Sequence, residues 1–164
     1  MFARYFVELP LAADAVEAAL IRDPHTWLPG LAEAANHRGD ALLTEVGFGD
    51  EVRIARRVTI ELGAPVRMPS KLVVPLRWAA TGKGLFPALD ADLEVASLGT
   101  ERTQLAMSAR YVPPLGAVGR VIDRAIMSRV AEATLKDFLD GVHDALLREA
   151  HDPSPVKEST APHG

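Results

Sequence analysis

The sequence contains no cysteine among its 164 residues. Disulfide bonds, thiol nucleophiles and cysteine-ligated metal centres are therefore excluded, and the composition suits a reducing compartment, so we expect a cytoplasmic protein. No apolar run approaches the roughly 18 residues that a membrane-spanning helix needs. Charged residues interrupt the first segment too early for the apolar core of a signal peptide, and we expect no integral membrane association.

Positive charge is not in excess, because 18 Lys and Arg residues face 22 Asp and Glu residues and the net charge is −4. A large basic face is not predicted, so nucleic acid and anionic membranes are poor candidate partners. The five histidines show no metal-ligand spacing. Gly-rich phosphate loops and nucleophile-elbow motifs are also missing, so we predict neither a metal nor a cofactor.

The first part of the chain reads as a strand followed by helices. We predict a strand over Phe2–Leu9, a helix over Ala12–Arg22 and a short second helix within Leu31–Asn36. Pro10 stops the strand and Asp23-Pro24 ends the first helix. Gly39-Asp40 marks the expected exit from the second helix.

From Ala41 to Val112 apolar residues recur with a period of two, as in strands with one buried side. Gly49-Asp50 marks a turn within this region. The acidic residues Asp90, Asp92 and Glu94 fall on the opposite, solvated side. The apolar side is predicted to carry Leu42, Thr44, Val46 and Phe48; Ile54, Arg56, Val58, Ile60 and Leu62; Leu72, Val74, Leu76, Trp78 and Ala80; Leu89, Ala91, Leu93 and Val95; and Thr103, Leu105, Met107, Ala109 and Tyr111.

A long helix is predicted from about Gly116 to Ala150, after Pro113-Pro114. One apolar stripe fits helical spacing and comprises Ala131, Leu135, Phe138, Leu139, Val142 and Leu146. Val118, Ile122, Ala125 and Ile126 fall on the opposite side of the same wheel. Either the helix breaks near Ile126–Val130, or it is continuous and its first turns are covered by another element or a partner chain. Residues 151–164 are proline-rich and poor in apolar mass, so we expect a disordered tail after a domain of residues 1–150.

Together these elements predict an α+β fold, in which an antiparallel sheet is covered on one face by a long C-terminal helix. Three segments resemble the START-like (SRPBCC, helix-grip) superfamily, and within it the polyketide cyclase/dehydrase-like proteins. They are Asp23–Gly30, Gly84–Pro87 continuing through Asp92-Leu93, and Tyr111–Gly119. The resemblance covers about residues 2–148 and implies a curved sheet wrapped around the helix, with a cavity between them.

Small inward residues on a curved sheet, such as Val58, Ala91, Val95 and Ala109, are consistent with such a cavity. The alternative is a fully packed core. The residues that we predict to contact a ligand are Arg56, Val58, Ile60, Leu76, Trp78, Leu93, Met107, Tyr111 and Phe138.

Arg56 falls between Ile54 and Val58 on the apolar side, where an unpaired guanidinium is costly. Either it binds an oxygen of a ligand, or it pairs with an internal carboxylate such as Glu45, or a bulge turns it to water. Trp78 and Tyr111 either stack on a ligand or belong to the core.

The apolar hairpin tip Leu85-Phe86-Pro87 has three open interpretations. It closes the mouth of the pocket as a gate, it contacts a second subunit in a homodimer, or it packs on the start of the long helix.

Three functions remain open at this stage. The first is binding or transport of a small hydrophobic ligand of lipid, polyketide or aromatic type. The second is a polyketide cyclase, aromatase or dehydratase-like reaction, which needs an acid or base in the pocket. The inward candidates Arg56, Tyr111, Thr44 and Thr103 include no histidine, so binding is favoured over catalysis. The third is a co-chaperone-like module that acts by protein contact through residues 85–87.

Overall fold

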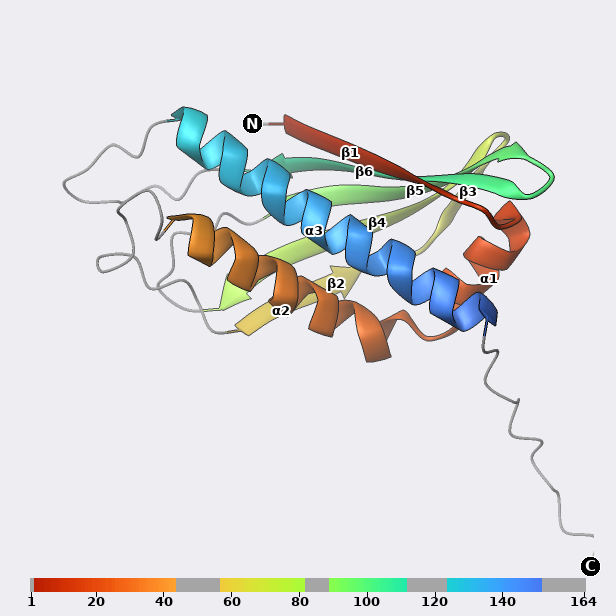
Figure 1. The fold of residues 1–164 in the computed structure, drawn as a ribbon, viewed down its shortest axis with the longest axis horizontal. Coiled ribbons are helices and arrows are strands. Elements are labelled where there is room, and N and C mark those ends of the chain that lie inside the picture. Colours follow the sequence, from red (N-terminus) through yellow and green to blue (C-terminus); the bar gives the residue numbers. More distant parts are fainter. Residues whose placement is uncertain (1, 44–56, 82–88, 112–123, 152–164) are drawn as a thin grey trace, which may run out of the picture.

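A computed structural model describes residues 2–43, 57–81, 89–111 and 124–151 (Figure 1). The element order confirms the predicted succession of one strand, two helices, several strands and a long helix. The elements are β1 (Phe2–Leu9), α1 (Ala13–Arg22), α2 (Pro24–Leu43), β2 (Arg57–Leu62), β3 (Val66–Met68), β4 (Lys71–Thr81), β5 (Leu89–Gly99), β6 (Arg102–Tyr111) and α3 (Arg124–His151).

The strands form one antiparallel sheet in the order β1-β6-β5-β4-β2, and β3 also pairs with β4. Helices α2 and α3 lie side by side over the same face of this sheet (Figure 1). Helix α3 contacts β1 and β6, whereas α2 contacts β2. We call the covered face the inner face. The described part of the chain therefore has the helix-grip arrangement that the sequence predicts.

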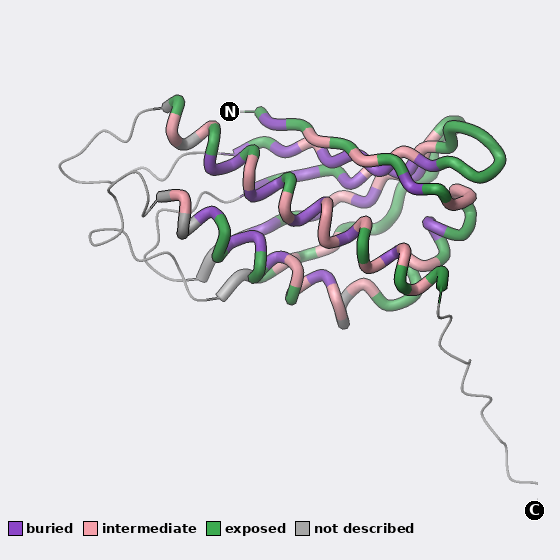
Figure 2. Tube along the Cα trace, in the orientation of Figure 1, coloured by how far each residue is buried: buried purple, intermediate pink, exposed green. Residues whose placement is uncertain are grey.

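The predicted alternation in β4, β5 and β6 is confirmed. The inner face of these strands is buried, and Figure 2 shows it in purple beneath the helices. On the outer face, Asp90 and Asp92 are exposed and Glu94 is half-buried. The buried inner residues are Leu72, Val74, Leu76, Trp78, Leu89, Ala91, Leu93, Val95, Thr103, Leu105, Met107, Ala109 and Tyr111.

The predicted stripe of α3 is also confirmed, because Ala131, Leu135, Phe138, Leu139, Val142 and Leu146 are all buried. Of the two alternatives for Ile126–Val130, the break is wrong and the continuous helix is confirmed, since α3 is uninterrupted from Arg124 to His151. The stripe simply begins at Val130, which is buried, whereas Ala125 in the preceding turn is exposed. Ile126 in this turn is half-buried and packs against the edge of the core, so α3 continues through the segment as a single helix.

Helix α2 is much longer than the predicted segment Leu31–Asn36 and continues through Gly39-Asp40 to Leu43. Leu42 and Leu43 are therefore helical, and their assignment to a strand is wrong. A buried stripe explains the extra turns, since packing outweighs the cost of about 1 kcal/mol for a glycine inside a helix. Pro24 suits the first helical position. The stripe consists of Leu28, Ala32, Ala35, Asn36 and Gly39.

Several predictions fall on residues 44–56, 112–123 and 152–164, outside the described parts of the chain. They include the strand positions Thr44, Val46, Phe48, Ile54 and Arg56, the turn at Gly49-Asp50 and the proline-rich tail.

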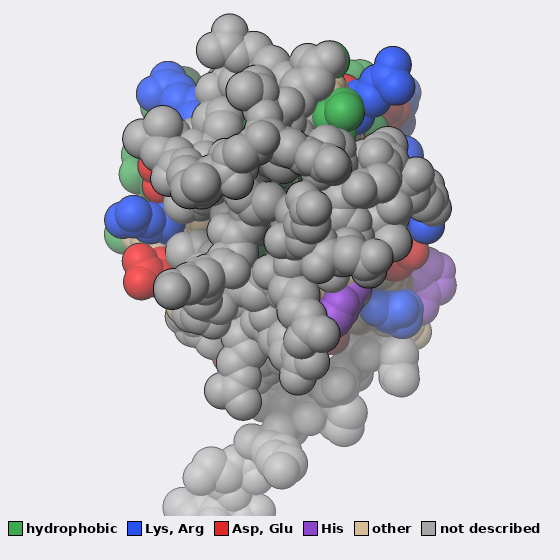
Figure 3. Space-filling model, turned by 90° about the vertical axis from the view of Figure 1, so that its left-hand side faces the viewer, with side chains coloured by type: hydrophobic (Ala, Val, Ile, Leu, Met, Phe, Trp, Pro, Cys, Tyr) green, Lys and Arg blue, Asp and Glu red, His purple; other side chains and the backbone are tan. Residues whose placement is uncertain are grey.

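Seen from one end, the described side chains at the margin carry both signs of charge (Figure 3). Within the described ranges, every helix is too short or too polar to span a bilayer.

Candidate ligand-binding site

One row of paired residues crosses four strands of the inner face. In this row Ile60 pairs with Trp78, Trp78 with Leu89, and Leu89 with Tyr111. Residues that pair directly point to the same face of a sheet, so these side chains form one line beneath the helices. The Trp78 ring lies 5.3 Å from the Phe138 ring at an interplanar angle of 60°, a favourable tilted arrangement. This contact joins the middle of the sheet to α3.

The structure brings most of the predicted ligand-contacting residues together. Leu76, Trp78, Leu93, Met107 and Tyr111 are buried on the inner face, and Phe138 is buried on α3 above it. Ile60 is half-buried on the same face. The side chain of Val58, the whole of Arg56 and the proposed gate Leu85, Phe86 and Pro87 lie outside the described residues. The ligand and gate roles of all these residues remain predictions.

The pairing register changes where the chain passes from β2 to β3. Leu62 pairs with Leu76 and Val66 pairs with Val73, so three residues on one strand face two on the other. This extra residue is the mark of a β-bulge, and Pro65 is tolerated there because a bulge interrupts the ladder. The Gly63 amide still donates a hydrogen bond to the Pro75 carbonyl at 2.8 Å.

The bulge turns the Arg67 side chain toward the helices. Unbroken alternation from Leu62 would place Arg67 on the outer face, but Arg67 instead pairs with the buried inner residue Leu72. From this side its guanidinium donates a hydrogen bond to the carboxylate of Glu17 in α1. That bond raises the pKa of Arg67 above its usual value. Glu17 is one of the buried polar residues, so the ion pair fastens the edge of the sheet to α1.

A cavity of about 370 Å³ opens between this bulge and the helices. Its floor includes the core residues Val74 and Leu93, and Leu20 and Leu28 form its helical wall. The outer rim is formed on the sheet side by Gly63, Ala64 and Pro65, and on the helix side by Ile21, Arg22, Asp23 and Pro24. We call this space the sheet-edge cavity and residues 22–24 the α1–α2 corner. The volume of the sheet-edge cavity lies at the low end of the roughly 300–1,000 Å³ typical of small-molecule sites.

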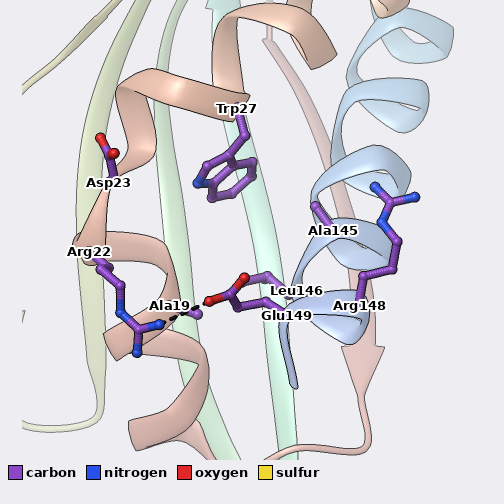
Figure 4. Close-up of a pocket in the computed structure, with 8 residues that line it drawn as sticks. All are labelled: Ala19, Arg22, Asp23, Trp27, Ala145, Leu146, Arg148 and Glu149. Atoms are coloured by element: carbon purple, nitrogen blue, oxygen red, sulfur yellow. Dashed lines mark hydrogen bonds and ion pairs between the residues drawn. The ribbon is translucent and has the colours of Figure 1, made fainter. Parts of the chain in front are cut away.

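A second cleft, of about 420 Å³, lies on the other side of the same corner (Figure 4). The Trp27 ring points into it from the first turn of α2, while Ala19 and Leu146 contribute from α1 and α3. Arg22 Nη1 donates a hydrogen bond to Glu149 Oε1 at 2.9 Å across this cleft. Arg22 and Asp23 line both the cleft and the sheet-edge cavity, so one charged corner separates two partly apolar spaces.

Two threonines among the described residues are fully buried and form hydrogen bonds with backbone carbonyls. The Thr103 hydroxyl donates to the Leu11 carbonyl at 2.7 Å, and the Thr134 hydroxyl donates to the Val130 carbonyl at 2.8 Å. Both bonds satisfy hydroxyl groups that would otherwise be costly to bury. Among the described residues, no group of three histidine or acidic side chains is arranged to hold a metal ion.

Sequence reasoning did not identify the sheet-edge cavity, Glu17, Arg67 or the α1–α2 corner as a site. Gly63-Ala64-Pro65 was an available signal, because glycine and proline together inside an alternating run are typical of a bulge. Leu93 is the predicted ligand residue that also lines the sheet-edge cavity.

No protein-family model matches the sequence, and no curated protein sequence matches it. Solved structures do resemble the fold. A conserved protein from Geobacillus kaustophilus aligns with a TM-score of 0.51 at 12% identity, over 91% of this chain and 97% of that one.

Two further structures align at lower scores. The Zhui aromatase/cyclase from Streptomyces sp. R1128 has a TM-score of 0.45 at 16% identity, covering 95% of this chain and 99% of its own. A START superfamily protein from Mycobacterium smegmatis has a TM-score of 0.44 at 10% identity, covering 90% and 97%. At such identities a likeness concerns the fold and does not transfer an activity. The antiparallel sheet, the two helices after β1 and the long α3 across the inner face together form the helix-grip architecture that the sequence predicts.

Proposed function

We propose that this protein binds a small hydrophobic molecule in the sheet-edge cavity. The observation that carries the proposal is a space of about 370 Å³ whose floor and helical wall are core side chains, namely Leu20, Leu28, Val74 and Leu93. An apolar molecule seated there leaves water for an apolar surface, which favours binding by roughly 25 cal/mol per Å² of buried apolar area. The few charged groups are at the rim, where they orient a ligand without being buried by it.

The cavity also adjoins the row of predicted ligand residues. Leu93 in its floor neighbours Met107 across the β5–β6 pair and Val74 across the β4–β5 pair. A ligand in the sheet-edge cavity would therefore touch the inner face, on which the sequence analysis predicts the ligand-contacting residues. The cyclase and protein-contact alternatives remain predictions, as do the roles of Arg56 and residues 85–87.

Binding is tested with Nile red, an uncharged dye whose fluorescence rises when it leaves water for an apolar site. We expect saturable binding to the wild-type protein. Ala64 is exposed at the rim, so Ala64→Trp fills the cavity without disturbing the core and should weaken dye binding about tenfold.

Ala34→Trp is the matched control, since Ala34 is exposed on α2 and is not among the residues that line the cavity. It should leave the dissociation constant unchanged. The proposal fails if wild-type protein does not bind the dye, or if Ala64→Trp binds it as tightly as Ala34→Trp does.

A further inference from the structure

The rim of the sheet-edge cavity carries charge of both signs. Arg22 and Asp23 are adjacent in the chain and both line the rim. Among the described residues that line the cavity, Arg22 and Asp23 are the ones with ionisable side chains. The other described lining residues are apolar or glycine. A charged ligand group at this rim would therefore meet one attractive and one repulsive partner.

Arg22 already forms an ion pair with Glu149. Its Nη1 donates to Glu149 Oε1 at 2.9 Å, and the two side chains are 62% and 40% exposed. A carboxylate or sulfate on a ligand would have to compete with Glu149 for the guanidinium while lying close to two acidic residues. A hydroxyl or carbonyl group, in contrast, accepts a hydrogen bond from a guanidinium without adding a second negative charge.

We infer that the sheet-edge cavity selects uncharged apolar molecules carrying a hydroxyl or carbonyl group, and that Glu149 sets this selectivity by occupying Arg22. This inference rests on the proposed function, since it names the class of ligand for the same cavity. Glu149 acts through Arg22 and lines the neighbouring cleft rather than the cavity itself, so it is a positioning residue. Figure 4 shows the two side chains meeting across that cleft.

Decanol and decanoate test the inference, because they share the same apolar chain and differ in charge at neutral pH. Each displaces Nile red from wild-type protein and from Glu149→Gln. Wild type should bind decanol more tightly than decanoate. In Glu149→Gln the freed Arg22 should improve decanoate binding about threefold to fivefold, the size expected for a partly exposed ion pair, and leave decanol binding within about twofold.

Glu132→Gln is the matched control. It removes the same charge from the same helix, about 25 Å along α3 from Glu149, so it reports the effect of net charge alone. Its decanoate affinity should equal that of wild type. Thermal unfolding of each variant establishes that the proteins compared are folded.

The outcomes separate the two proposals. If wild type binds neither Nile red nor decanol, the proposed function fails and the selectivity fails with it. If Nile red and decanol bind and Ala64→Trp weakens them, the proposed function stands. In that case the selectivity is overturned by decanoate binding as tightly as decanol to wild type, or by Glu149→Gln behaving like Glu132→Gln.

Discussion

The β1 side of the inner face and its β2–β3 side are built differently. On the β1 side, the strand keeps one register with β6 from Phe2 to Leu9, and α3 packs against it. On the β2–β3 side, the register shifts between Leu62 and Val66, and a cavity lies between the sheet and the helices. Regular pairing closes one side, while a single inserted residue leaves space on the other.

This difference shows how one sheet can combine a packed core with an open cavity. On the regular side the alternation keeps one set of β1 side chains on the face against which α3 packs, and in this set Ala3 and Leu9 are only 4% and 1% exposed. On the bulged side the same alternation is reset, and an arginine reaches α1 where an apolar side chain would otherwise lie. Stability is therefore expected to depend more on the regular side and ligand binding more on the bulged side.

The largest expected effect compares two buried leucines. Leu135 lies in the α3 stripe and Leu28 lines the cavity, and they are 0% and 1% exposed. Leu135→Ala should lower the free energy of unfolding by about 3–5 kcal/mol, because it creates a void in packed core. Leu28→Ala should cost only about 2–3 kcal/mol, since this side chain already borders open space. Urea denaturation measures both, and equal losses would remove the proposed contrast between the two sides.

Gly63→Ala probes the bulge itself. A Cβ atom at this position would lie 3.1 Å from Pro75 Cβ, and a proline ring inside a strand has little freedom to move away. We expect a loss of about 1–2 kcal/mol in the free energy of unfolding, the usual cost of an added methyl group in a tight site. Urea denaturation again provides the value. An unchanged stability would show that the two strands separate easily at the bulge.

Much of the fold follows from periodicity alone. The inner residues of β4, β5 and β6 and the buried stripe of α3 could be predicted because the apolar pattern repeats several times along each element. The length of α2 was missed since Gly39-Asp40 resembles a helix exit, although Leu28, Ala32 and Ala35 already trace a helical stripe. Local propensity gave way there to burial against α3.

The sheet-edge cavity was harder to predict than the fold. It depends on a register shift of one residue, which reverses the direction of every side chain that follows. The ion pair between Arg67 and Glu17 joins positions 50 residues apart. The sequence around each residue does not indicate the direction of its side chain. Leu93 was selected as a ligand residue by alternation, but the opening beside it is created by Gly63-Ala64-Pro65.

A smaller effect is expected from the ion pair that fastens the bulged side. Arg67→Met keeps most of the side-chain length but leaves the buried carboxylate of Glu17 without its guanidinium, which is costly inside a protein. The urea midpoint should fall. Arg102→Met is the matched control on the other side of the sheet, because Arg102 and its partner Glu8 are 64% and 48% exposed. Its midpoint should stay within error, since exposed pairs contribute little. A larger fall for Arg102→Met would contradict the role assigned to Glu17.

The smallest effect concerns the contact between α2 and α3. A Cβ atom on Gly141 would lie 3.0 Å from Leu31 Cδ2, the end of a flexible side chain that can turn aside. Alanine also favours the helix by up to about 1 kcal/mol over glycine. Gly141→Ala should therefore change the free energy of unfolding by less than about 1 kcal/mol, with gain and strain nearly cancelling. Comparison with Gly63→Ala in the same urea series shows how the cost of an added methyl group depends on the residue beside it. The Pro75 ring at the bulge cannot move away, whereas the end of the Leu31 side chain between the helices can. If Gly141→Ala proved the more harmful of the two, the helical layer rather than the bulge would be the less adaptable part of the molecule.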